Sequence, residues 1–228
     1  CADLRRWASA LIVWTGAALA LLTPGLLVPV PVRAQELPAG GAVVNGAASV
    51  GSSGDGLLID QSSATAIINW DSFSIADGRT VTFANGGGAT LNRVTGTDTS
   101  YIDGTLTASG SAYLINQNGI VVGPNGIVRT GGTFVASTLD VDDIDFLDGG
   151  SLTFAGDSGA SVVNLGSVSS LGGDVALIAH TVVNSGTISA PDGTAALVAG
   201  REVLMRDASL DDGQFVVRIG SPDSSVTE

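Results

Sequence analysis

Four aspartates stand close together between Val141 and Gly149, where their carboxylates could bind a cation. Clustered carboxylate oxygens suit calcium, but an EF-hand loop also requires a glycine and a distal glutamate at fixed positions. The spacing in this stretch does not match that loop. We therefore predict a solvated surface loop, with a calcium site as the alternative. The aspartates are Asp142, Asp143, Asp145 and Asp148.

Residues for catalysis are few elsewhere in the chain. The one histidine is His180 and the one cysteine is Cys1, which argues against a His- or Cys-based catalytic centre and a zinc site. Polysaccharide hydrolases gather carboxylates on one face, whereas Asp174, Asp192 and Arg201 are scattered. We predict that the protein is not an enzyme and needs no cofactor. The alternative is a stand-alone β-helical carbohydrate-active enzyme, and His180 is expected at a surface corner.

The tripeptide Asn-Gly-Ile occurs twice within a few residues, at Asn118–Ile120 and at Asn125–Ile127. Asparagine and glycine favour turns because both tolerate positive φ, and a short apolar stretch follows each copy. The strands are too short and too close for a hairpin. A chain that turns every few residues while burying Ile and Val on one side is typical of a β-solenoid coil.

An internal repeat of about 20 residues supports the same fold in the second half of the chain. Val162–Val168 aligns with Val182–Ile188, and Gly173–Ala179 aligns with Gly193–Ala199. The apolar and β-branched content indicates strands, so each repeat is predicted to form one coil of a stack of parallel strands. The alignment predicts three sets of neighbours on successive coils: Asn164 below Asn184, Leu177 and Leu197 both pointing inward, and Val203 continuing the series of Val163 and Val183.

The first half of the chain also indicates short strands rather than helices. Residues 42–58 contain irregular apolar pieces that are expected to cap one end, and residues 64–83 alternate with a period of two. Trp70 and Phe73 are expected to anchor the core. Further strands are predicted at 89–94, 104–108, 112–115 and 132–140.

Residues 1–34 have the pattern of a secretory signal peptide. Arg5 and Arg6 precede an apolar run from Trp7 to Leu22, and Val32-Arg33-Ala34 offers a cleavage site. The alternative is a membrane-spanning helix, although the prolines after Leu22 would break its second half. Without this segment 21 acidic residues and six arginines remain, a net charge of −15 with no lysine. Such a surface argues against nucleic acid as a partner.

Five segments, in this order, resemble the N-terminal secretion domain of filamentous-haemagglutinin-type exoproteins, the haemagglutination activity domain family of two-partner secretion. They are INWDSFSI (68–75), VTF (81–83), LNRVTG (91–96), INQNGIVVG (115–123) and GGTFVASTLDV (131–141). The resemblance implies an all-β, right-handed parallel β-helix with an N-terminal cap. We expect a signal peptide at 1–34, the secretion domain at 35–145, and further coils at 146–228.

The resemblance also implies partners and a location. Family members are exported to the periplasm of Gram-negative bacteria, recognised there by an outer-membrane barrel transporter with POTRA domains, and secreted or held at the cell surface. The family's long adhesive or toxic C-terminal region is absent from these 228 residues. We therefore expect an amino-terminal fragment, whose contacts with host-cell or surface receptors would lie in that region.

The family motif Asn-Pro-Asn-Gly corresponds here to Asn116-Gln117-Asn118-Gly119, so the turn lacks the φ restraint of proline. No Asn-Pro-Asn-Leu motif is present, which points to the branch of adhesins of non-haemagglutinin type. The asparagines are expected either to hold the local backbone or to contact the transporter. The candidate transporter-recognition residues are Asn92, Arg93, Asn116, Asn118, Gly119, Ile120, Asn125 and Gly126.

Overall fold

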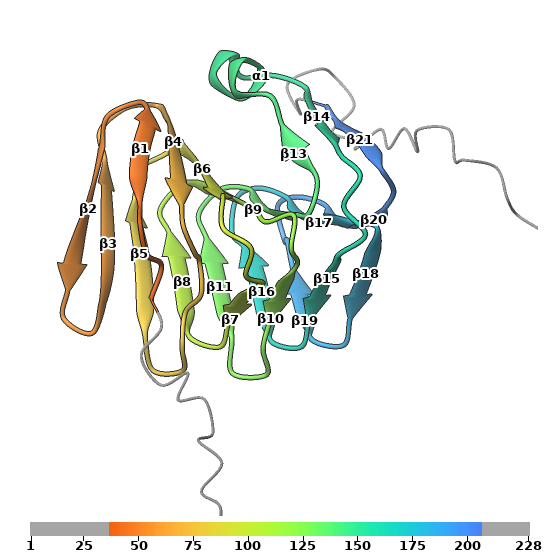
Figure 1. Ribbon diagram of the computed structural model, residues 1–228, viewed down its shortest axis with the longest axis horizontal. Helices are drawn as coiled ribbons and strands as arrows, with labels where there is room; N and C mark the ends of the chain where they lie inside the picture. Colours follow the sequence, from red (N-terminus) through yellow and green to blue (C-terminus); the bar gives the residue numbers. More distant parts are fainter. Residues whose placement is uncertain (1–36, 207–228) are drawn as a thin grey trace, which may run out of the picture. The chain divides into compact units, whose positions relative to one another are not determined.

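The computed structural model describes residues 37–206, a parallel β-solenoid of about six turns with one short helix (Figure 1). Three sheets line the coils. Sheet 1 contains β1 (Ala42–Asn45), β4 (Thr65–Trp70), β6 (Ala89–Val94), β9 (Ser111–Ile115), β12 (Phe134–Ser137), β17 (Val175–Ala179) and β20 (Ala195–Ala199). Sheet 2 contains β7 (Ser100–Ile102), β10 (Ile120–Val122), β15 (Ser161–Asn164) and β18 (Thr181–Asn184). Sheet 3 contains β2 (Ala48–Ser53), β3 (Gly56–Gln61), β5 (Thr80–Ala84), β8 (Thr105–Ala108), β11 (Ile127–Thr130), β16 (Ser167–Ser170) and β19 (Thr187–Ser189).

The first strands cap the solenoid, as the sequence predicts. β1 pairs with β4 in the antiparallel direction, and β2 pairs with β3 as an antiparallel hairpin. The hairpin turns at Gly54, which has a φ of 58°, a value that glycine adopts without strain. Antiparallel strands at the end of a parallel stack cover an edge that would otherwise be open to pairing with another chain. The predicted parallel β-helix with an N-terminal cap is therefore confirmed.

One hydrophobic core fills the inside of the coils. Trp70 and Phe73 are each 1% exposed and meet edge to face, with ring centroids 5.4 Å apart, so their prediction as core anchors is confirmed. Ile102, Val122 and Val162 continue this core along the following coils.

A second core, which the sequence analysis did not predict, lies on the outer face of sheet 1. It is covered by helix α1 (Asp143–Asp148) and by sheet 4, which contains β13 (Asp140–Val141), β14 (Leu152–Ala155) and β21 (Glu202–Met205) (Figure 1). Tyr113 of β9 meets Phe146 of α1 edge to face at 5.2 Å. Strand β12 is consequently buried on both faces, with Phe134 in the inner core and Val135 in the outer one.

The prediction of a solvated loop between Val141 and Gly149 is wrong in part, because Asp143–Asp148 forms α1. The side chain of Asp142 caps the helix by accepting a hydrogen bond from the Ile144 N–H at 2.8 Å. The aspartates of the first turn interact favourably with the positive end of the helix dipole. Phe146 is buried in the second core. The acidic pattern of the sequence does not predict the helix, because this burial depends on residues from other parts of the chain.

The 20-residue repeat correctly predicts the register of the later coils. Asn164 pairs with Asn184, and its amide Nδ2 donates to Asn184 Oδ1 at 2.8 Å. Leu177 pairs with Leu197 and is fully buried, but Leu197 is 51% exposed. The predicted burial of Leu197 is therefore wrong, because β20 is the last strand of sheet 1 in the described residues.

Val203 does not continue the series of Val163 and Val183. It lies on β21, which leaves the coils and pairs antiparallel with β14 over the second core. No helix within residues 37–206 is long and apolar enough to cross a membrane. The predicted signal peptide at 1–34, and residues 207–228 of the further coils expected at 146–228, lie outside the described residues.

Candidate recognition site

Asn92 and Arg93 are adjacent on β6 and point to opposite faces of sheet 1. Asn92 is 1% exposed, accepts a hydrogen bond from Trp70 Nε1 at 3.0 Å and donates to the Tyr113 carbonyl at 3.2 Å. These bonds satisfy a polar side chain inside the core. Asn92 therefore supports the coil and presents no surface to a partner.

Arg93 holds the outer layer to the solenoid. Its guanidinium forms ion pairs with Asp140 at 2.9 Å and Asp143 at 2.7 Å, and donates to the Val141 carbonyl at 2.9 Å. Burial lowers the pKa of Arg93, but the hydrogen bonds to Asp143 and Asp140 outweigh this effect and raise the pKa. The charge is thus kept at all ordinary pH values, and part of the acidic stretch serves this contact.

The first Asn-Gly turn is built by Asn116 and Asn118. Asn116 is fully buried; its Oδ1 accepts from the Asn118 N–H at 2.9 Å, and its carbonyl accepts from the Gly119 N–H at 3.0 Å. Gly119 has a φ of 105°, which a side chain would strain. Ile120, which follows, is fully buried in the inner core.

The two asparagine amides hold the 96–100 loop of the preceding coil. Asn118 Nδ2 donates to the Gly96 carbonyl at 2.8 Å, and Asn116 Nδ2 donates to the Asp98 carbonyl at 2.9 Å and to Ser100 Oγ at 2.9 Å. The Thr99 hydroxyl donates back to the Asn118 carbonyl at 2.7 Å. The motif is therefore used within the protein to fix the shape of a neighbouring loop.

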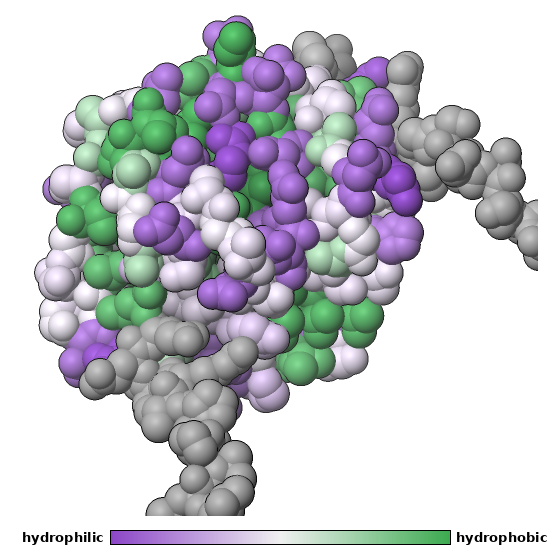
Figure 2. Space-filling view, viewed as in Figure 1, coloured by the Kyte–Doolittle hydropathy of each residue, from purple (hydrophilic) through white to green (hydrophobic). Residues whose placement is uncertain are grey.

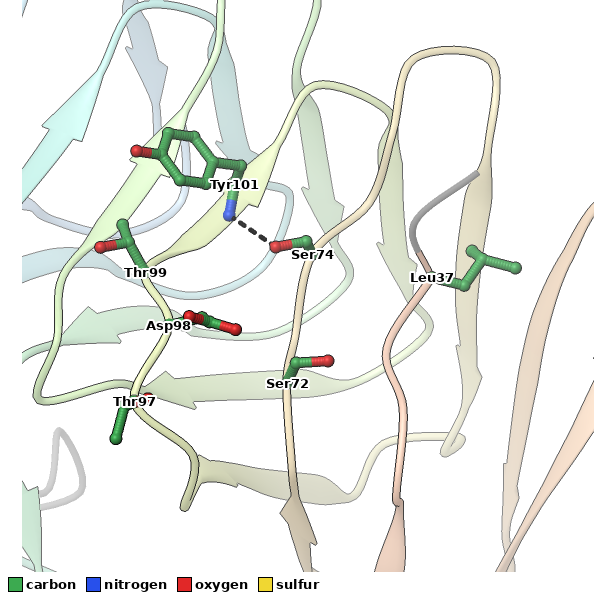
Figure 3. Close-up of a pocket in the computed structure, with 7 residues that line it drawn as sticks. All are labelled: Leu37, Ser72, Ser74, Thr97, Asp98, Thr99 and Tyr101. Carbon is green, nitrogen blue, oxygen red and sulfur yellow. Dashed lines mark hydrogen bonds between the residues drawn. The ribbon is translucent and has the colours of Figure 1, made fainter. Parts of the chain in front are cut away.

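A hollow of about 500 Å³ opens between the 96–100 loop and the segment 72–75 (Figure 3). Ser74 Oγ closes one end by accepting from the Tyr101 N–H at 3.1 Å. In Figure 3 the Asp98 side chain extends from the loop toward the segment that carries Ser72 and Ser74. The lining residues are Leu37, Ser72, Ser74, Thr97, Asp98, Thr99 and Tyr101. The sequence analysis missed this hollow, although the serine- and threonine-rich run 95–100 marks its position.

The second Asn-Gly turn differs from the first. Asn125 is exposed, and its side chain makes no hydrogen bond within residues 37–206. A Cβ atom on Gly126 would collide with the Ile102 carbonyl of the preceding coil, so the turn requires glycine there. The structure thus brings Asn116, Asn118 and Gly119 together against the 96–100 loop that borders the hollow, and leaves Asn92 and Arg93 in separate structural roles.

Two of the residues considered for catalysis make structural contacts, and the other two are exposed. Asp174 accepts a hydrogen bond from the Thr194 N–H at 2.7 Å, and Arg201 pairs with Asp157 at 3.2 Å. Asp192 is exposed, and His180 lies exposed at the bend between β17 and β18, as predicted. Within residues 37–206 no group of three histidine, cysteine, aspartate or glutamate side chains could hold a metal ion.

The outer face of sheet 2 carries aligned apolar side chains. Val121, Val163 and Val183 lie in register on β10, β15 and β18, and Val183 is 41% exposed. Figure 2 shows apolar side chains gathered at the lower right, over β15 and β18.

A family model described as the TPS secretion domain matches residues 34–225. The chain belongs to this family. The crystal structure of the HMW1 secretion domain from Haemophilus influenzae is similar, with 35% identity and a TM-score of 0.69 over 75% of this chain and 46% of that chain. The filamentous hemagglutinin secretion domain shares the fold, with 17% identity and a TM-score of 0.55 over 80% of this chain and 67% of that one.

The chain is also 39% identical over 113 residues to the heme/hemopexin-binding protein of Haemophilus influenzae. The match covers 49% of this chain and 12% of that protein's length. These relatives are secretion domains and a binding protein rather than enzymes. TPS secretion domains belong to proteins exported through the outer membrane of Gram-negative bacteria, and each works with a dedicated transporter in that membrane.

Proposed function

We propose that this TPS secretion domain is the targeting module of a larger adhesin-like exoprotein, and that the POTRA domains of its outer-membrane barrel transporter recognise it in the periplasm. Membership of the family supports this role. The match to 12% of the heme/hemopexin-binding protein is consistent with a module within a much longer protein. A net charge of −13 and the absence of lysine also suit a protein partner better than nucleic acid.

The observation that carries the proposed recognition surface is the use of Asn116 and Asn118. Their amides fix three acceptors on the 96–100 loop, so that the loop has one defined shape before any partner arrives. Preorganisation of this kind favours binding because less conformational entropy is lost on association. Asn116 and Asn118 therefore act on the transporter through the loop, and Asn125 is the motif residue left available for direct contact.

The role of the transporter is tested by secretion in cells. With the cognate transporter present, the parent chain should reach the medium, and without it the chain should remain in the periplasm. Appearance of the folded chain in the medium without the transporter would overturn the proposal.

The recognition surface is tested by Asn118→Gly, which keeps a tight turn and removes the amide that holds Gly96. One neutral hydrogen bond is worth about 1 kcal/mol, so binding to the transporter should weaken about fivefold while the circular dichroism spectrum stays unchanged. Gln117→Ala is the matched control, because Gln117 is exposed and its side chain makes no hydrogen bond within the described residues. Equal binding by both variants would remove the loop from the recognition surface.

The alternative of a carbohydrate-active enzyme receives little support. Asp174 and Arg201 are engaged in structural contacts, and Asp98 is the one carboxylate among the described residues that line the hollow. Release of reducing sugar from bacterial or plant polysaccharides by the purified chain would favour the enzyme.

A further inference from the structure

We propose that the hollow beside the 96–100 loop binds a cationic side chain of the transporter, a lysine ammonium or an arginine guanidinium, with the Asp98 carboxylate as its charged acceptor. The inference rests on the proposed function, because it names the chemical group by which that partner is read.

The hollow exists because the parallel ladder opens at this point. The Thr95 N–H donates to the Trp70 carbonyl at 2.8 Å, and the Ile75 N–H donates to the Tyr101 carbonyl at 2.8 Å. Between these two bonds, within the described residues, no backbone hydrogen bond joins 71–74 to 96–100. The path from Thr95 to Tyr101 is one residue longer than the path from Trp70 to Ile75, so the loop bulges away and leaves the space.

The bulge is held rigidly rather than collapsed. The main-chain carbonyl of Asp98 accepts from Asn116, which is fully buried, and the neighbouring Ser100 N–H donates to the Gly119 carbonyl at 3.0 Å. The Asp98 backbone is therefore fixed while its carboxylate has no hydrogen-bond or ion-pair partner within residues 37–206. A fixed backbone with an uncommitted charge is suited to binding a ligand without large reorganisation.

The electrostatics of the hollow favour a cation. Among the described residues that line the hollow, Asp98 is the one with an acidic or basic side chain, and the serine and threonine hydroxyls beside it have oxygens that can accept from an ammonium or guanidinium. None of the five arginines within residues 37–206 forms an ion pair with Asp98. Three of them pair with other aspartates: Arg79 with Asp55, Arg93 with Asp140 and Asp143, and Arg201 with Asp157. With a net charge of −13 on the chain, an anionic ligand would be repelled.

The test is binding of the purified full chain to the full-length transporter in lipid nanodiscs, measured by biolayer interferometry at several salt concentrations. Asp98→Asn removes the charge and keeps the shape. It should weaken binding about tenfold, as expected for a lost charged hydrogen bond, and should make binding less dependent on salt. Asp192→Asn is the matched control, since Asp192 is an exposed aspartate in a turn remote in sequence from the hollow and the net charge changes equally. It should bind within twofold of the parent.

Asp98→Glu separates a specific contact from long-range attraction, because it keeps the charge and moves the carboxylate by one methylene. Weaker binding by Asp98→Glu than by the parent supports a contact in the hollow. If Asp98→Asn and Asp192→Asn bind equally, the inference is overturned while the proposed function stands. If the parent itself does not bind the transporter, the proposed function fails first. Circular dichroism of each variant confirms that the fold is kept.

Discussion

Leu177 and Leu197 are a matched pair for testing the stacking of the coils. They are the same residue at paired positions of neighbouring strands β17 and β20, yet Leu177 is fully buried and Leu197 is 51% exposed. Truncation of a buried leucine to alanine costs about 2–5 kcal/mol, from lost transfer free energy and the cavity that remains. For Leu177→Ala we expect about 3 kcal/mol. Leu197→Ala leaves no closed cavity and removes a side chain that is already half in water, so we expect about 1 kcal/mol or less.

The two variants are compared by thermal unfolding of the purified chain, followed by circular dichroism. For a domain of 150–250 residues, 1 kcal/mol shifts the midpoint by about 2–4 °C. Leu177→Ala should therefore lower the midpoint by about 6–12 °C, and Leu197→Ala by about 4 °C or less. Solenoids can unfold in parts, so the comparison uses the change between two variants in one assay.

Equal losses of stability for Leu177→Ala and Leu197→Ala would refute this reasoning. That result would mean that Leu197 is covered in solution as completely as Leu177. A small loss for Leu177→Ala would instead contradict the inner core, since Leu177 packs there with Val175 and Ala179.

Two further substitutions test the outer layer and the first Asn-Gly turn. Arg93→Gln should destabilise the chain by about 1–3 kcal/mol and speed hydrogen exchange in α1, because it leaves Asp140 and Asp143 without their cation. The control Arg201→Gln, at an exposed ion pair, should change neither stability nor exchange. Unchanged exchange in α1 of Arg93→Gln would show that Arg93 does not hold the helix. Gly119→Ala should cost about 1–3 kcal/mol in chemical unfolding because φ is 105°, and a neutral effect would contradict the turn geometry.

The features that the sequence predicts well are those that repeat. Asn164 and Asn184 align because each coil has about the same length, and parallel stacking carries that alignment directly into space. The corner glycines Gly126, Gly166 and Gly186 follow the same rule, since a Cβ on each would meet the backbone of the coil beneath. Residues one repeat apart in the sequence therefore become neighbours on successive coils, and no knowledge of other long-range contacts is needed to predict this.

The features that the sequence does not predict depend on contacts between distant residues. The acidic stretch by itself predicts a loop, because the sequence does not show that Arg93, 47 residues before Asp140, binds Asp140 and Asp143. Val203 fits the spacing of the repeat but lies outside the coils, because β21 pairs with β14 and buries Val203 with Phe154 in the second core. Neither the ion pairs of Arg93 nor the pairing of β21 with β14 produces a periodic pattern in the sequence.

The two Asn-Gly turns show the same limit at the candidate site itself. Asn118 and Asn125 begin identical tripeptides, Asn-Gly-Ile, and the local sequence predicts the same role for both. The preceding coil decides between them: it presents the Gly96 carbonyl to Asn118, and it offers Asn125 no hydrogen bond within the described residues. An amide bonded inside the protein fixes shape, whereas an amide without a partner can bind something else. We therefore expect Asn118→Gly to act on the transporter through the 96–100 loop, and Asn125→Ala, if it weakens binding, to do so while that loop keeps its protection from hydrogen exchange. Loss of loop protection in Asn125→Ala would show that the second turn also supports the loop, and the division of roles between the turns would be wrong.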